Sequence, residues 1–99
     1  MSFQQFSVCE AYGQKLVILT NTLFNGVDSM LVATIQSCSE INLIKGLQIP
    51  IMLDEEPYYV DLLDIATISK KQIKTASPKD LQLYRSEITS GLDLLIDGF

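Results

Sequence analysis

The sequence contains no histidine, and its only arginine is Arg85. It therefore lacks the side chain that most often works as an acid or base near neutral pH. It also lacks a glycine-rich phosphate loop and a serine in a nucleophile-elbow context. With so few cations available to hold a phosphate, the composition argues against an enzyme, and against a ribonuclease in particular. The residues that could still serve such an activity are Asp61, Asp64, Lys70 and Lys71.

Cysteine is scarce as well. Cys9 and Cys38 lie in unrelated contexts without metal-ligand spacing, so we expect neither a metal site nor a cofactor. We expect two reduced thiols in the cytoplasm, with a single disulfide as the alternative. No leader pattern and no apolar run of membrane-spanning length is present, so neither secretion nor membrane insertion is indicated.

The composition favours a protein partner. Hydrophobic residues make up 47% of the 99-residue chain and charged residues 19%, which is apolar for a small monomer and predicts a homodimer. The net charge of -5 disfavours general binding to a nucleic-acid backbone, and we expect no sequence-specific nucleic-acid binding. Without an internal repeat or linker, residues 1–99 are expected to form one domain.

Most of the chain reads as β-structure. Short runs rich in β-branched and aromatic residues, separated by turn residues, predict strands. Lysines mark the last run as an edge strand. One or two helical turns are predicted at 37–47. The predicted strands are Phe3–Glu10, Lys15–Asn21, Met30–Gln36, Ile49–Asp54, Tyr58–Leu63, Ile65–Ile68 and Ser69–Thr75.

The last quarter of the chain predicts one long helix. Ser77 can cap it and Pro78 suits its first position. Apolar residues then recur at helical spacing over a length of roughly 28 Å. Strands followed by a single helix predict an α+β fold that is mainly β. The apolar stripe consists of Leu81, Tyr84, Ile88, Leu92 and Leu95.

Several segments resemble the CcdB family, the toxin half of a bacterial toxin–antitoxin pair. They are LVILTNTLFNGVDSMLVATI, IPIMLDEEPYYV, ATISKKQI, LQLYRSEI and the closing GLDLLIDGF. The resemblance implies a small SH3-like barrel with an additional antiparallel sheet and one long C-terminal helix. It also implies a homodimer that binds the breakage-reunion subunit of DNA gyrase, traps the cleaved gyrase–DNA complex, and is neutralised by a CcdA-like antitoxin.

The resemblance also implies which residues act, by binding and without catalysis. The gyrase contact would be made by Asp97, Gly98 and Phe99, with Asp93 one turn earlier. Asp97 stands where the best-studied member has a tryptophan. Second-tier partner contacts are Asn21, Thr22, Leu23 and Phe24, for which an ordinary turn is the alternative. Two other functions stay open: an inert relative that binds only antitoxin, and a ribonuclease toxin related to MazF or Kid.

Overall fold

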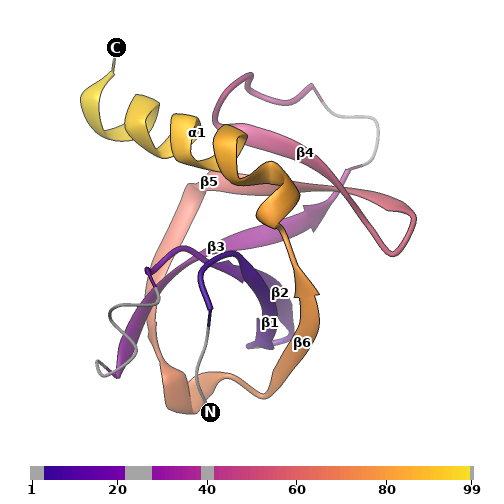
Figure 1. Ribbon diagram of the computed structural model, residues 1–99, viewed down its shortest axis with the longest axis vertical. Coiled ribbons are helices and arrows are strands. Elements are labelled where there is room, and N and C mark those ends of the chain that lie inside the picture. The colour runs from indigo at the N-terminus through magenta and orange to yellow at the C-terminus, as the bar shows by residue number, and fades with distance from the viewer. Residues whose placement is uncertain (1–3, 22–27, 39–41, 99) are drawn as a thin grey trace.

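The computed structural model describes residues 4–21, 28–38 and 42–98. Its strands are short at the N-terminus and longest in the middle of the chain (Figure 1). They are β1 (Ser7–Ala11), β2 (Gln14–Ile18), β3 (Ser29–Ser37), β4 (Gln48–Leu53), β5 (Glu56–Ser69) and β6 (Thr75–Asp80). Short 3-10 turns η2 (Lys70–Gln72) and η3 (Gln82–Tyr84) lead into and out of β6, and helix α1 (Arg85–Asp97) follows.

All six strands belong to one antiparallel sheet in the order β4-β5-β3-β2-β1-β6. The sheet curls into a partial barrel at the β1, β2 and β6 end, while α1 lies across its other end (Figure 1). The predicted class, a mainly β fold of the α+β type with one C-terminal helix, is confirmed. The predicted barrel and additional sheet are parts of one continuous sheet here, because the long strand β5 pairs with β3 on one side and with β4 on the other.

A large bulge in β5 makes this continuity possible. On β3, Ala33 pairs with Ile65 and the next residue pairs with Asp61, so residues 62–64 have no partner on β3. The Leu62 amide instead donates to the Leu47 carbonyl at 3.0 Å. Bulges bend a strand and increase its twist. Here β5 passes under α1 and then turns down the side of the curled sheet (Figure 1).

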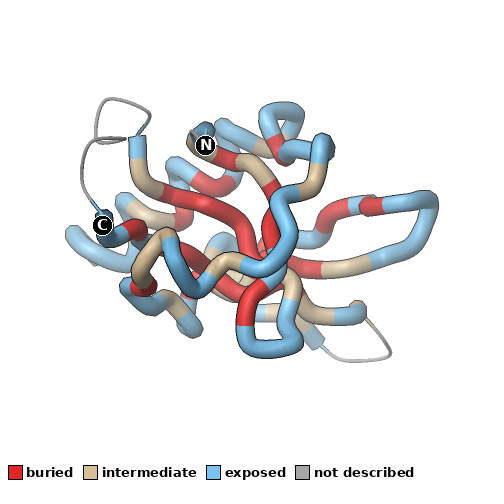
Figure 2. The backbone as a smooth tube through the Cα atoms, turned by 90° about the horizontal axis from the view of Figure 1, so that it is seen from below, coloured by how far each residue is buried: buried red, intermediate tan, exposed pale blue. Residues whose placement is uncertain are grey.

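Each face of the sheet has its own apolar core, because side chains alternate along each strand. The core on the helix face contains Phe6, Val17, Leu62 and Ile88, all at most 1% exposed. The core inside the curl is smaller and is built around Cys9, Leu16, Ile18, Met30, Val32 and Ile68. Figure 2 shows that burial follows the middle of the strands, whereas the hairpin tips are exposed.

The C-terminal helix begins later than predicted. The predicted cap Ser77 and the first helical position Pro78 lie in β6, which pairs with β1, and α1 starts only at Arg85. Pairing with β1 wins over the capping signal because β1 otherwise presents an unpaired edge. Leu81 and Ile88 are buried as the apolar stripe predicts, whereas Leu95 is 41% exposed.

Two smaller predictions also differ. Within the predicted edge strand Ser69–Thr75, residues 70–72 form η2, capped by the Ser69 side chain. Residues 42–47 contain turns and no helix, and the rest of that predicted helical segment lies partly outside the described residues. In the described part of the chain, no helix has the length and apolar character needed to span a membrane.

Candidate functional site

A small polar cavity, here called the notch, opens where strand β2 begins beside the end of β3. The β2–β3 ladder stops at the pair Lys15 and Ile35, whereas the β3–β5 ladder continues to Ser37 and Tyr58. The end of β3 is therefore paired on one side only, and the space beside it has a volume of about 300 Å³. It is lined by Gly13, Gln14, Lys15, Thr34, Ile35, Gln36, Ser37 and Tyr58.

The β1–β2 hairpin fixes one wall of the notch. Tyr12 and Gly13 both have positive φ, as the favoured two-residue hairpin turns require. This turn places Glu10 directly opposite Lys15, and the Lys15 ammonium lies 3.4 Å from the Glu10 carboxylate. Both side chains stay accessible, at 35% and 50% exposed, so either can meet a ligand from solvent.

The opposite wall of the notch contains Thr34 and Gln36, and hydrogen bonds join them to Asp64 behind that wall. The Thr34 hydroxyl donates to the Asp64 carboxylate at 3.1 Å and accepts from the Gln36 side-chain amide at 3.3 Å. Thr34 is buried, with 7% of its surface exposed. A buried hydroxyl that donates and accepts in this way has a fixed orientation, and it fixes its neighbours.

Together these groups suit a phosphodiester. Lys15 supplies a positive charge for a phosphate at the notch. Glu10 does not line the notch itself, but its carboxylate lies beside the Lys15 ammonium and can accept a proton. Gln36 and Ser37 add neutral hydrogen-bonding groups at the rim. Side-chain alternation puts Lys15 and Ile35 on one face of the sheet and Gln36 on the other. A strand of nucleic acid that crosses this end of the sheet could therefore contact both.

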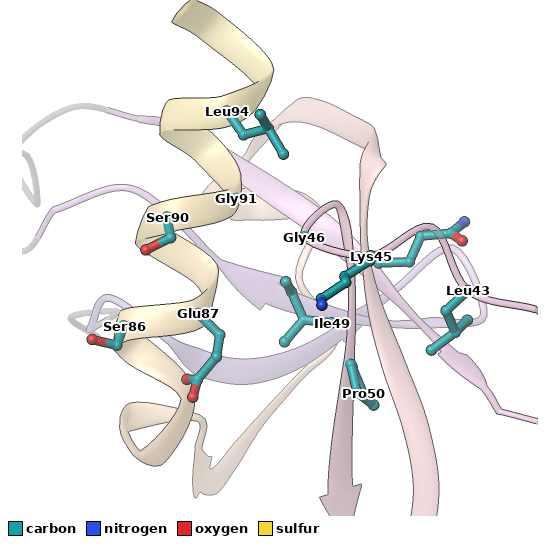
Figure 3. Close-up of a pocket in the computed structure, with 11 residues that line it drawn as sticks. Leu43, Lys45, Gly46, Ile49, Pro50, Ser86, Glu87, Ser90, Gly91 and Leu94 are labelled. Atoms are coloured by element: carbon teal, nitrogen blue, oxygen red, sulfur yellow. The ribbon is translucent and has the colours of Figure 1, made fainter. Parts of the chain in front are cut away.

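A larger cavity of about 720 Å³ lies between α1 and the segment that leads into β4 (Figure 3). Its lining is mostly apolar, with Ile49 on the sheet side and Leu94 on the helix side. Lys45 and Glu87 are the charged residues among those that line it. This groove offers shape and apolar surface, whereas the notch concentrates polar groups.

The predicted gyrase-contact residues lie at the far end of α1. Asp93, Asp97 and Gly98 are exposed there, and the Gly98 amide closes the helix by donating to the Leu94 carbonyl at 2.9 Å. Phe99 lies outside the described residues. These residues are remote in sequence from the notch and do not line it.

Of the second-tier candidates, Asn21 is exposed just after β2. Thr22, Leu23 and Phe24 lie outside the described residues.

The four residues named for a ribonuclease are not brought together. Asp61 and Asp64 sit at the β5 bulge, whereas Lys70 and Lys71 lie in η2 at the far end of that strand. Three residues of the site were not predicted from the sequence: Glu10, Lys15 and Gln36. The signal available for the first two was a hairpin turn with an acid and a base at equal distances from it. Gln36 carries no such signal.

Neither cysteine belongs to a disulfide. Cys9 is fully buried in the curl, and burial, with a smaller contribution from the negative charge of Glu10, raises the pKa of its thiol to about 11. Within the described residues, no group of three or more acidic or cysteine side chains is placed to hold a metal ion.

No family model and no curated protein matches the chain, but solved structures do. An endoribonuclease from a mycobacterial species is 12% identical, with 98% of this chain and 93% of that chain covered and a TM-score of 0.80. A mycobacterial endoribonuclease solved with its cognate antitoxin is 13% identical, with 97% and 94% covered and a TM-score of 0.77. A protein described as an Mtb toxin is 15% identical, with 93% and 99% covered and a TM-score of 0.68. At these identities the likeness establishes a shared fold.

This result corrects the family prediction. The resemblance to CcdB, with its gyrase-poison function, is wrong: of the matching structures named above, two are endoribonucleases and one is described as a toxin, and none is described as a gyrase poison. Leu81 and Ile88, which belong to one of the segments that carry the resemblance, are buried in the core, so these two positions reflect the fold and do not specify a target.

The prediction of a non-enzymatic protein is also contradicted, because two of these structures are enzymes. The absence of histidine does not exclude an enzyme, because a carboxylate can accept a proton and an ammonium can stabilise a developing negative charge.

Proposed function

We propose that this chain is the toxin of a toxin–antitoxin pair and that it acts as an endoribonuclease. The observation that carries the proposal is the agreement of 97% and 98% of the chain with two endoribonucleases, at TM-scores of 0.77 and 0.80. One of these enzymes was solved with its cognate antitoxin, which supports an antitoxin partner here as well. The polar notch supports the same function, because it offers groups that suit a phosphodiester.

The proposed reaction is attack of a ribose 2′-oxygen on the neighbouring phosphate. In this reaction the Glu10 carboxylate accepts the 2′-hydroxyl proton, and the Lys15 ammonium stabilises the negative charge that develops on the phosphate oxygens. Their 3.4 Å separation in the free protein keeps both groups at one place until the RNA arrives. The attack forms a bond from the 2′-oxygen to phosphorus and breaks the bond from phosphorus to the 5′-oxygen. The departing 5′-oxygen takes a proton from solvent water, so the products carry a 2′,3′-cyclic phosphate and a 5′-hydroxyl, and Glu10 returns its proton to solvent.

The acidic composition determines how strongly the RNA binds and how far binding depends on salt. At a net charge of -5, the chain as a whole repels RNA, so binding depends on a few local contacts. For single strands the slope of log affinity against log salt is about -0.7 per neutralised phosphate. We therefore expect weak binding with a shallow salt dependence and a preference for unpaired RNA.

The test is cleavage of a purified unstructured RNA, comparing the wild-type protein with Lys15→Gln. We expect the variant to lose about 10²–10³-fold in rate, the usual effect of removing one group that stabilises developing charge. The Glu10–Lys15 pair is exposed, so its loss should change stability by about 1 kcal/mol or less. A melting curve checks that the variant is folded.

The matched control is Lys71→Gln, which removes an exposed lysine from η2, away from the notch. It should cleave RNA like the wild type. A wild-type protein that binds an antitoxin but leaves RNA intact would be an inert relative, and the proposal would fail. If both lysine variants cleave at the wild-type rate, the notch is not the active site.

A further inference from the structure

We propose that Gln36 reads an adenine base of the RNA strand in the notch, and that Asp64, acting through Thr34, is the positioning residue that fixes its amide. This inference rests on the proposed function and deepens it, because it names what the site recognises. The observation behind it is the chain of hydrogen bonds from Gln36 to Thr34 to Asp64.

The single hydroxyl proton of Thr34 determines which group donates and which accepts in these two hydrogen bonds. A hydroxyl has one proton to donate, and Thr34 donates it to the Asp64 carboxylate at 3.1 Å. A carboxylate cannot donate in return, so the Thr34 oxygen is left to accept, and it accepts from Nε2 of Gln36 at 3.3 Å. The amide nitrogen of Gln36 is thereby held at Thr34, and its oxygen is directed elsewhere. A glutamine amide without such a hydrogen bond could instead flip, so that its oxygen and nitrogen exchange positions.

The bulge in β5 makes Asp64 available for this role. Thr34 pairs in register with Asp61, but that carboxylate accepts from the backbone amide of Leu63 at 3.0 Å and from the Gln48 side chain at 3.5 Å. The unpaired residues 62–64 bring a second carboxylate, Asp64, to Thr34. The two neighbouring acids thus differ: one supports the bulge itself, and the other holds the Thr34–Gln36 pair.

A fixed amide offers an acceptor oxygen beside its remaining N–H donor. Adenine is the purine that complements this pair, because its N6 amino group donates and its N7 accepts, whereas guanine presents two acceptors on the same edge. Single-stranded RNA exposes these edges to side chains. Gln36 is half-buried at the rim of the notch, on the face opposite to Lys15. A nucleotide crossing the sheet end can place its phosphate at Lys15 and its base at Gln36.

The test measures which base stands beside the cut in a pool of RNA oligonucleotides with randomised sequence. For the wild type we expect adenine to exceed guanine by about tenfold at one position, the discrimination typical of a good bidentate contact. Asp64→Ala and Thr34→Val each release the amide, so this ratio should fall below about twofold. Gln36→Glu leaves only acceptors and should shift the preference toward cytosine, whose N4 amino group donates. The ratio is taken among products, so it does not depend on the total rate.

The control is Asp93→Ala, which removes an exposed carboxylate on α1, away from the notch, and should keep the adenine preference. If the wild type cleaves no RNA, the proposed function fails and this inference fails with it. If RNA is cleaved but Asp64→Ala and Thr34→Val keep the wild-type profile, only this inference is overturned. An equal loss of preference in Asp93→Ala would also overturn it, because the effect would then not depend on the hydrogen bonds at Thr34.

Discussion

The two faces of the sheet bury their apolar residues by different means. On the helix face, the core is closed by a separate element, α1, whose Ile88 is fully buried against the strands. On the other face, the strands cover themselves by curling, and Cys9 and Val32 lie inside the curl. The first core therefore depends on the docking of one helix, and the second on the curvature of the sheet. The notch lies where the β2–β3 ladder ends, between these two cores.

The strongest test of the helix-face core is Ile88→Ala. Ile88 is fully buried, and truncating such a residue removes apolar contacts and leaves a cavity, so we expect a loss of about 2–5 kcal/mol. The measurement is the free energy of unfolding in urea. Thr89→Ala, at the exposed neighbouring position, should change it by about 0.5 kcal/mol or less. Equal effects of the two changes would mean that α1 adds little to this core.

A smaller effect is expected from Gly91→Ala, which tests how closely the helix must approach. A Cβ atom at Gly91 would collide with the Leu62 side chain and lie 2.5 Å from the Gly46 carbonyl oxygen. Overpacking of this kind costs about 1–3 kcal/mol, against a gain in helix propensity of about 1 kcal/mol. We expect net destabilisation in the same urea titration.

Ser90→Ala is the matched control for this prediction, because Ser90 is exposed on the same turn. It should leave stability nearly unchanged. A stabilised Gly91→Ala variant would show that the segment around Gly46 can move away from the helix at little cost in free energy.

The smallest effect concerns the curled face and its pH dependence. Burial raises the pKa of the Cys9 thiol to about 11, whereas an unfolded chain ionises cysteine near 8.5. Between these values the unfolded state holds fewer protons than the folded state, so stability falls as pH rises. We expect a loss of about 1 kcal/mol from pH 7 to pH 9.

Cys9→Ala should flatten this dependence, and the difference between the two pH profiles isolates the thiol from other groups. Identical slopes for the wild type and Cys9→Ala would contradict the expected shift. The partly buried Cys38 serves as an internal comparison. Its thiol should react with a small alkylating agent in the folded protein, whereas Cys9 should react only after unfolding.

Most of the predicted strands and the first part of the helix stripe are found in the structure, because they depend on local pattern. The alternation in β4 and the spacing of Leu81 and Ile88 are read directly from the chain. The helix start failed because Ser77 and Pro78 carry a capping signal that local pattern cannot weigh against pairing with β1, seventy residues away in sequence. The late start of α1 is a tertiary effect that overrides a local preference.

Most of the candidate site could not be predicted from the sequence. Glu10 and Lys15 flank a recognisable turn, so their pairing was open to prediction. The contact between Thr34 and Asp64 spans thirty residues and depends on the bulge at 62–64, for which the sequence carries no clear marker. The C-terminal helix has the most distinctive sequence pattern in the chain, but much of that pattern consists of residues that pack in the core.

A mainly β chain with one C-terminal helix follows from the amino-acid order alone, because hydrophobic periodicity and turn residues act over a few positions. The composition also determines the chemical groups available: no histidine, one arginine and an excess of acids. Only the tertiary structure decided which of these groups meet. The register of the strands places Lys15, at the start of β2, beside the end of β3, and the bulge brings Asp64 to Thr34. Such contacts between distant segments follow from how the whole sheet packs and bends.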